Sequence, residues 1–197
     1  GLKKSLRKKR LLDDSPYKDV VFISYPKSGR TWVRVIMDYL GIDARYDHDA
    51  ANIAYHPEKD YSNFEIDKEK YAGKRIILII RYPRDTVVSS YFHAVYRQKI
   101  FDGTLSEFIA DRKFGLHKIL DFQKTWLNGG NIASAFLVIR YEDLHKDTFN
   151  TFKSILTFLD AGDISGKKLR DTIEMFKFRN MKALEQNGVF RLRYGKI

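Results

Sequence analysis

One short segment of the chain combines the groups that bind a phosphate or sulfate anion. Residues 25–32 read YPKSGRTW, and the anion-binding members are Lys27, Ser28, Gly29, Arg30 and Thr31. A glycine-bearing turn at the start of a helix presents backbone N–H groups to an anion, and the helix dipole strengthens the attraction. The lysine adds a point charge, and the hydroxyl groups add donors. We interpret the segment as a phosphate cradle in preference to a plain strand–helix turn with a surface lysine.

The order of these residues differs from that of a magnesium-dependent nucleotide-binding loop. A Walker A loop places Lys directly after its last Gly, and Ser or Thr directly after that Lys. Here Lys27 precedes Gly29, and Arg30 precedes Thr31. Such enzymes also commonly carry an acid at the end of a neighbouring strand, where this chain carries Arg81. We therefore expect an anion site without a metal ion.

A second candidate anion site follows the next apolar segment, where residues 81–89 read RYPRDTVVS. The fork of Arg81 suits a phosphate held by two parallel hydrogen bonds. Ser89 lies in the helix expected to follow, where its hydroxyl could meet the same anion. Asp85 suits the first turn of that helix, so we assign it a structural role. Two cationic sites on adjacent strands indicate a ligand phosphorylated at two separated places.

Short apolar segments rich in β-branched residues alternate with segments of helical period. Strands are predicted at residues 19–25, 74–81 and 135–141. Helices are predicted at residues 31–40, 84–98, 104–112, 118–127 and 148–159, and loops with short helices at 42–72. This alternation predicts an α/β fold in which a central parallel sheet lies between two helical layers, a three-layer αβα sandwich. Right-handed crossovers would bring the strand ends, and the ligand, to one edge of the sheet.

The length of 197 residues suits a single domain, which we place at 19–197 after a basic segment at 1–18. The net charge of +11 is concentrated at the two ends: residues 1–10 carry six bases and no acid, and 165–197 carry nine bases and three acids. The stretch between them is nearly neutral, so we expect no nucleic-acid partner. We expect 3–10 to be a solvated terminus with at most a weak contact to an acidic membrane surface.

The chain has no cysteine, which excludes disulfides, zinc ribbons and thiol nucleophiles. Its longest aliphatic run is the five residues 76–80, whereas a membrane span needs about 20. We see no signal peptide. These features favour a cytoplasmic location.

Together the two motifs resemble those of the sulfotransferases that use 3′-phosphoadenosine 5′-phosphosulfate (PAPS). The YPKSGxTW segment is similar to the family's 5′-phosphosulfate loop, and RxPxDxxxS to its 3′-phosphate motif. The blocks YEDL at 141–144 and FRNMK at 178–182 are also similar to family segments. The resemblance covers residues 19–187. It implies a P-loop-NTPase-like fold and transfer of a sulfuryl group from PAPS to a hydroxyl or amine, with 3′-phosphoadenosine 5′-phosphate (PAP) as the product.

The resemblance also implies residue roles. Lys27 would contact the bridging oxygen and stabilise charge on the leaving phosphate, and residues 28–31 would bind the 5′-phosphate largely through backbone amides. Arg81 and Ser89 would hold the 3′-phosphate.

Two aromatic residues, Trp32 and Phe178, would pack against the adenine in this resemblance. From the residues alone, ordinary core packing explains either of them equally well, because both stand in apolar helical patterns. The block at 141–144 is assigned no chemistry.

The general base has two candidates, His48 in the sequence Asp-His-Asp and His56 before a proline. A carboxylate beside His48, such as Asp49, could orient its imidazole and raise its basicity. The His-Asp pair also resembles bacterial relatives, so we favour His48. The other histidines are interpreted as surface or packing residues: His93, His117 and His145.

The family's later Arg-Lys-Gly segment has no clear counterpart. Residues 191–195 are a poor match, and the chain stops at Ile197, so we expect a C-terminal portion to be missing or truncated. Two rival functions are a P-loop kinase or NTPase and a non-enzymatic polyanion-binding module. The sequence indicates neither an oligomeric state nor whether the acceptor is a small molecule, a lipid or a saccharide.

Overall fold

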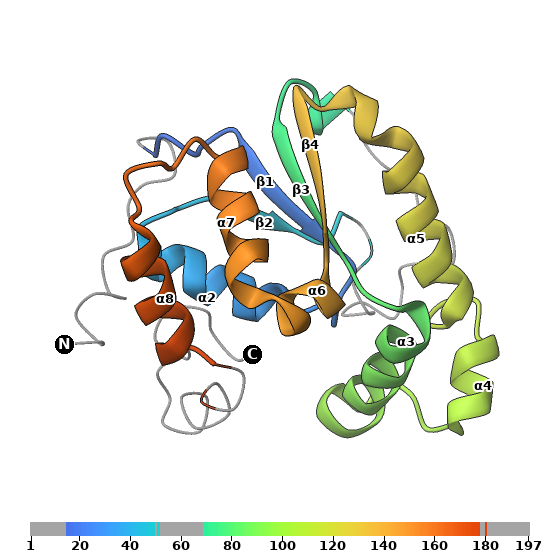
Figure 1. The fold of residues 1–197 in the computed structure, drawn as a ribbon. Helices are drawn as coiled ribbons and strands as arrows, with labels where there is room; N and C mark the ends of the chain where they lie inside the picture. The colour runs from blue at the N-terminus through green and yellow to red at the C-terminus, as the bar shows by residue number, and fades with distance from the viewer. Residues whose placement is uncertain (1–14, 50, 52–68, 178–179, 181–197) are drawn as a thin grey trace.

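Four parallel strands form the centre of the structure, a computed structural model in which residues 15–49, 51, 69–177 and 180 are described (Figure 1). In sheet order they are β2 (Arg45–Asp47), β1 (Val20–Ser24), β3 (Arg75–Ile80) and β4 (Ala135–Arg140). The α-helices are α2 (Arg30–Leu40), α3 (Pro83–Phe92), α4 (Leu105–Ala110), α5 (Leu116–Gly129), α6 (Tyr141–Lys146), α7 (Thr148–Phe158) and α8 (Gly166–Met175). The shorter elements are the 3₁₀ turns η2 (Glu69–Tyr71) and η4 (Gly130–Ile132) and the π-helix η3 (His93–Gln98).

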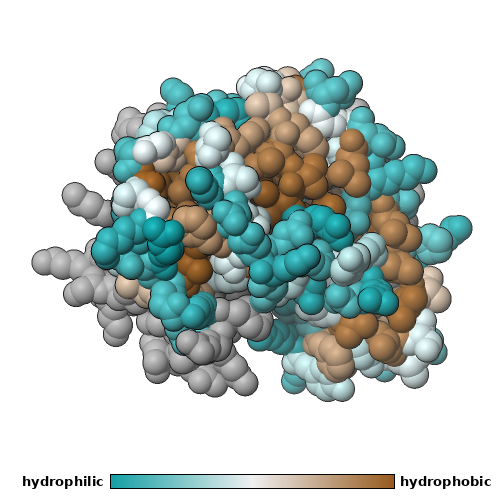
Figure 2. All heavy atoms as spheres, viewed as in Figure 1, coloured by the Kyte–Doolittle hydropathy of each residue, from teal (hydrophilic) through white to brown (hydrophobic). Residues whose placement is uncertain are grey.

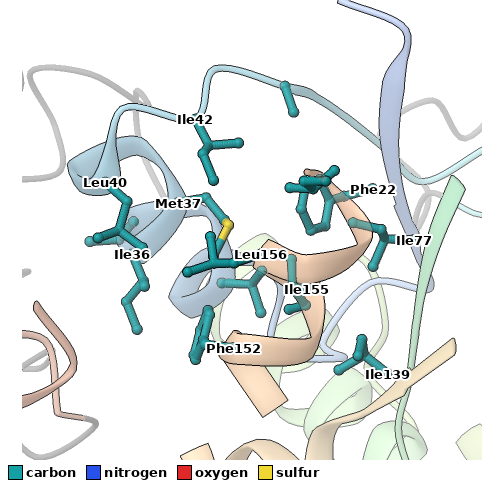
Figure 3. Close-up of a cluster of buried hydrophobic side chains, with 14 of the residues drawn as sticks. Phe22, Ile36, Met37, Leu40, Ile42, Ile77, Ile139, Phe152, Ile155 and Leu156 are labelled. Atoms are coloured by element: carbon teal, nitrogen blue, oxygen red, sulfur yellow. The ribbon is translucent and has the colours of Figure 1, made fainter. Parts of the chain in front are cut away.

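Helices cover both faces of the sheet and make two hydrophobic cores. Successive residues of a strand point to opposite faces, so Val20 and Phe22 belong to one core while Val21 and Ile23 belong to the other. The first core joins the sheet to α2, α7 and α8, and Figure 3 shows Phe22 near Met37 and Ile155 within it. The second joins it to α3, α4 and α5. The predicted three-layer αβα sandwich is therefore confirmed.

Strand β2 was not predicted, because Arg45, Tyr46 and Asp47 show no apolar alternation. It pairs in parallel with β1 at one edge of the described sheet, and Tyr46 stacks on Phe22 with ring centroids 4.8 Å apart. Figure 2 shows hydrophobic residues at the surface along β4, at the other edge, where Val138 is 36% exposed. Nowhere in the described ranges is a helix long and apolar enough to cross a membrane.

The helix predicted at 84–98 is two elements. The α-helical part ends at Phe92, and the last six residues form η3, which ends at Lys99 in a left-handed conformation. The helices α6 and α8 were also not predicted. Both are short and mostly polar, and their packing against the first core stabilises them.

Candidate functional site

The first motif forms the predicted strand–turn–helix. Strand β1 ends at Ser24, a turn follows, and α2 begins at Arg30. Within the turn Lys27 and Gly29 both have positive φ, 70° and 88°. A left-handed lysine is unusual and is a mark of functional sites. Thr31 is exposed in the first turn of the helix.

The turn contains a buried polar atom that suits an anion. Ser28 is 1% exposed, yet its Oγ has no hydrogen-bond partner in the part of the chain that the structure describes. Buried polar groups are nearly always paired, so an unpaired hydroxyl at a helix start fits a bound oxygen atom. The residues present therefore fit the phosphate that the sequence predicts for this turn.

Position 29 needs a glycine for two reasons, its left-handed backbone and the nearby ring of Tyr141. A Cβ atom built there would lie 2.3 Å from Cδ2 of Tyr141. We expect Gly29→Ala to lower the free energy of unfolding by about 2–5 kcal/mol, the sum of a left-handed alanine and an overpacked contact. Denaturant unfolding measures this value.

Gly41 provides the matched control for that substitution. Its φ is 90°, but no atom lies within 4 Å of its would-be Cβ. Gly41→Ala should therefore cost only the backbone contribution, about 1–2 kcal/mol. Equal costs at the two glycines would mean that the Tyr141 ring moves aside freely.

The second motif meets the first through Arg81. This residue follows β3, and its Nη1 donates a hydrogen bond of 3.0 Å to the carbonyl oxygen of Lys27. Its guanidinium lies 4.4 Å from the centroid of the Tyr141 ring. The Nε of Arg81 is buried with no hydrogen-bond partner among the described residues. The two predicted anion sites are thus brought together at the carboxyl edge of the sheet. Ser89 is half-buried on α3, and its contact with a phosphate stays a prediction.

His48 lies at the same edge, immediately after β2. Its Nδ1 is 2.6 Å from the carbonyl oxygen of Ser24, so Nδ1 carries the proton and Nε2 has the lone pair that a general base needs. Burial and the charge of Arg30 lower the pKa of His48 to about 3, although the Ser24 bond and Asp47 act in the opposite direction. A flanking carboxylate, Asp47, thus raises the pKa of His48 as expected, but burial and Arg30 outweigh it.

Asp49 makes other contacts instead of orienting the imidazole. It is 1% exposed, accepts a hydrogen bond of 3.0 Å from Tyr71 Oη, and lies 3.1 Å from Lys70 Nζ. Its φ of 45° turns the chain away after His48. The carboxylate thus fixes the backbone beside the histidine. The rival base His56 lies outside the described residues.

Trp32 packs in the first core. It is 5% exposed, and its Nε1 donates a hydrogen bond of 2.7 Å to the carbonyl oxygen of Phe176. Its ring centroid lies 5.0 Å from that of His145. Contact between Trp32 and adenine stays a prediction, and Phe178 lies outside the described residues.

His93, which we interpreted from the sequence as a surface or packing residue, is half-buried in the structure. It opens the π-helix η3, and its Nδ1 is buried without a partner among the described atoms. Burial and the charges of Lys27 and Arg97 lower the pKa of His93 to about 4. A neutral imidazole therefore lies within electrostatic reach of Lys27. The residue begins a π-helix, an element that is common at functional sites, but nothing in the sequence marks a π-helix here.

The fold is that of an α/β protein in which the two predicted anion sites adjoin at the carboxyl edge of the sheet. A family model described as "Sulfotransferase domain" matches residues 17–195, so the chain belongs to the sulfotransferase family. The predicted resemblance is confirmed, and with it the predicted class of enzyme, a PAPS-dependent sulfotransferase. The rival kinase and polyanion-binding functions are not favoured.

Several relatives support this assignment. Sulfotransferase 2A2 of Rattus norvegicus is 25% identical over 200 residues, which are 87% of this chain and 68% of the relative. Amine sulfotransferase of Oryctolagus cuniculus is 24% identical over 206 residues, 89% of this chain and 67% of the relative. The crystal structure of mouse sulfotransferase SULT7A1 complexed with PAP matches 92% of this chain and 70% of that chain, with a TM-score of 0.60 and 20% identity. The structural match shows the shared fold.

Proposed function

We propose that Lys27 and His48 carry out the transfer of a sulfuryl group from PAPS to a hydroxyl or amine acceptor in this protein. The hydrogen bond from Arg81 to the Lys27 carbonyl carries the proposal, because it joins two anion sites that suit the two phosphorylated ends of one nucleotide. The unpaired Oγ of Ser28 and Nε of Arg81 support it, since each suits an oxygen of a bound anion.

The chain's groups would act on three sides of the reacting centre. Bound PAPS supplies the sulfuryl group and a phosphate leaving group. The backbone amides of the turn and the start of α2 bind that phosphate, and Lys27 Nζ meets the negative charge that grows on the oxygen released from sulfur. His48 Nε2 takes the proton of the acceptor as its oxygen or nitrogen bonds to sulfur. Positioning and fixed charges supply most of the rate enhancement.

The low pKa of His48 is compatible with this role once the donor is bound. Arg30 is one of the two causes of the lowered pKa, after burial. We propose that Arg30 contacts the 5′-phosphate, whose negative charge would offset that of the guanidinium. The pKa of His48 would then rise toward its usual value of 6.5, where an imidazole is a more effective base.

We propose an acceptor that is a small molecule, a lipid or a saccharide. One relative is named Amine sulfotransferase, which supports a nitrogen acceptor as well as an oxygen one. We also propose a cytoplasmic location, which the relative named Cytosolic sulfotransferase 15 of Arabidopsis thaliana supports. The weak membrane contact predicted for 3–10 lies outside the described residues.

Thermal unfolding with nucleotides tests the proposed donor. We expect PAP at a hundredfold excess over its dissociation constant to stabilise the protein by about 2.7 kcal/mol, or a rise in Tm of about 5–10 °C. ATP with magnesium should give a much smaller rise, because the site offers two separated anion positions and an arginine in place of a metal-binding acid. Equal shifts with both nucleotides would contradict the proposal.

A further inference from the structure

The block YEDL received no chemistry from its sequence, yet its first residue touches both anion motifs. Tyr141 opens α6, which lies between the starts of α2 and α3 at the carboxyl end of the sheet (Figure 1). One edge of its ring is so close to Gly29 that a Cβ there would lie 2.3 Å from Cδ2. Its face lies 4.4 Å from the guanidinium carbon of Arg81. One side chain therefore contacts the turn of the first motif and the arginine of the second.

Neighbouring contacts hold this ring in place. His145, one helical turn further along α6, packs edge-on against it with centroids 4.6 Å apart and planes at 71°. Glu142 Oε1 accepts a hydrogen bond of 2.8 Å from the backbone N–H of Tyr82, the residue after Arg81. The first turn of α6 is thus attached to the segment after β3 through the Glu142 carboxylate as well as through the Tyr141 ring.

The contacts that Tyr141 and Lys27 make with Arg81 are uncharged. The face of an aromatic ring attracts a guanidinium through its quadrupole, and the Lys27 carbonyl accepts from Nη1. Burial raises the pKa of the Tyr141 hydroxyl, so it stays neutral at physiological pH. These groups orient Arg81 without neutralising it, which leaves its charge available to an incoming phosphate. A carboxylate in the same place would compete with that phosphate.

We propose that Tyr141 is a positioning residue whose ring holds the Gly29 turn and the Arg81 guanidinium in one fixed arrangement, so that the two phosphates of the nucleotide meet preformed sites together. The inference rests on the proposed function, since it assigns Arg81 to the 3′-phosphate. It accounts for a glycine at 29, for the orientation of Arg81 and for the aromatic residue that opens α6. Preorganised charges bind better than charges that must be ordered at the moment of binding.

Calorimetry with PAP and with adenosine 5′-phosphate (AMP), which lacks the 3′-phosphate, separates positioning from bulk stability. Tyr141→Leu is expected to weaken PAP about tenfold while weakening AMP much less, because Arg81 loses its orientation. Tyr141→Phe keeps the ring and should bind PAP within about twofold of the wild type. Tyr96→Leu is the matched control, because Tyr96 is 67% exposed and lies on the π-helix, and its PAP-to-AMP affinity ratio should not change.

A double-mutant cycle with Arg81→Ala completes the test. Once Arg81 is removed, Tyr141→Leu should cause little further loss of PAP over AMP, because both changes abolish the same oriented charge. Tyr141→Met fills most of the same space without an aromatic face, and it replaces Tyr141→Leu if thermal melts show that the leucine variant does not fold.

Each outcome bears on one of the two proposals. A wild-type protein that does not bind PAP refutes the proposed function. If the wild type binds PAP and the leucine variant weakens PAP and AMP equally, the positioning role is overturned and Tyr141 only stabilises the fold. If Tyr141→Phe loses as much PAP affinity as the leucine variant, the hydroxyl and not the ring carries the role, which also overturns the inference.

Discussion

Replacing His48 with alanine is expected to reduce sulfuryl transfer by about 10²–10⁴-fold while PAP affinity stays within a few-fold of the wild type. The reason is geometric. With Nδ1 bonded to the Ser24 carbonyl, only Nε2 can accept a proton, and a base touches the acceptor and not the nucleotide. Steady-state rates at saturating donor, with PAP calorimetry on the same preparation, measure both quantities.

His56→Ala is the comparison, because His56 is the rival base. It should cost much less activity than His48→Ala with the same acceptor, and thermal melts of both variants should show intact folds. An inactive His56→Ala protein beside an active His48→Ala protein would reverse the assignment. If neither variant loses activity, the base is another group, and Asp47 or Asp49 becomes the next candidate.

The pH dependence of the rate provides a second measure of the same assignment. Protonated His48 cannot act as a base, so the rate must fall as the pH falls through its pKa. That pKa is about 3 in the structure, against an ordinary value of 6.5. If donor binding offsets the charge of Arg30 as proposed, the acid limb at saturating donor should have an apparent pKa between these two values. An acid limb above 6.5 that disappears in His48→Ala would contradict this electrostatic account.

The central elements of the fold could be predicted because their signals are local. The run before Ser24 is short, apolar and β-branched, and α2 combines helical spacing with a glycine at its end, where Gly41 takes a left-handed φ of 90°. Strand β2 could not be predicted, because its three residues are extended only through pairing with β1. The π-helix at 93–98 could not be predicted either, because nothing in its sequence separates it from an α-helix.

Some features of the candidate site could also be predicted from the sequence, and others could not. Lys27 and Arg81 could be predicted as neighbours because they follow two apolar segments that become adjacent parallel strands, β1 and β3. The contact of Tyr141 with the Gly29 turn could not be predicted, because it joins distant parts of the chain. The pKa of His48 was misjudged because its sequence neighbours are acids, whereas in space burial and Arg30 dominate. Sequence motifs identify the charged residues, but the distances and burial in the fold determine their contacts and pKa values.

Arg81→Ala is expected to weaken PAP by about ten- to hundredfold and AMP far less. Loss of a charge-assisted contact costs about 1.5–3 kcal/mol, or roughly ten- to hundredfold in affinity, and AMP has no 3′-phosphate for Arg81 to contact. Arg81→Ala should also weaken AMP slightly, because the Nη1 bond to the Lys27 carbonyl supports the turn proposed to bind the 5′-phosphate. Arg81→Lys keeps the charge without the fork and should fall between the two proteins.

The neighbouring Arg84 supplies the control for that measurement. Its side chain is 86% exposed in the first turn of α3, so Arg84→Ala removes the same charge three residues away and should leave the PAP-to-AMP ratio unchanged. Calorimetry with both nucleotides at one ionic strength compares the variants, because screening changes phosphate affinity on its own. Equal weakening of PAP and AMP by Arg81→Ala would show that Arg81 only supports the Lys27 turn. The 3′-phosphate would then need a different partner, and Ser89 on α3 would be the first residue to test.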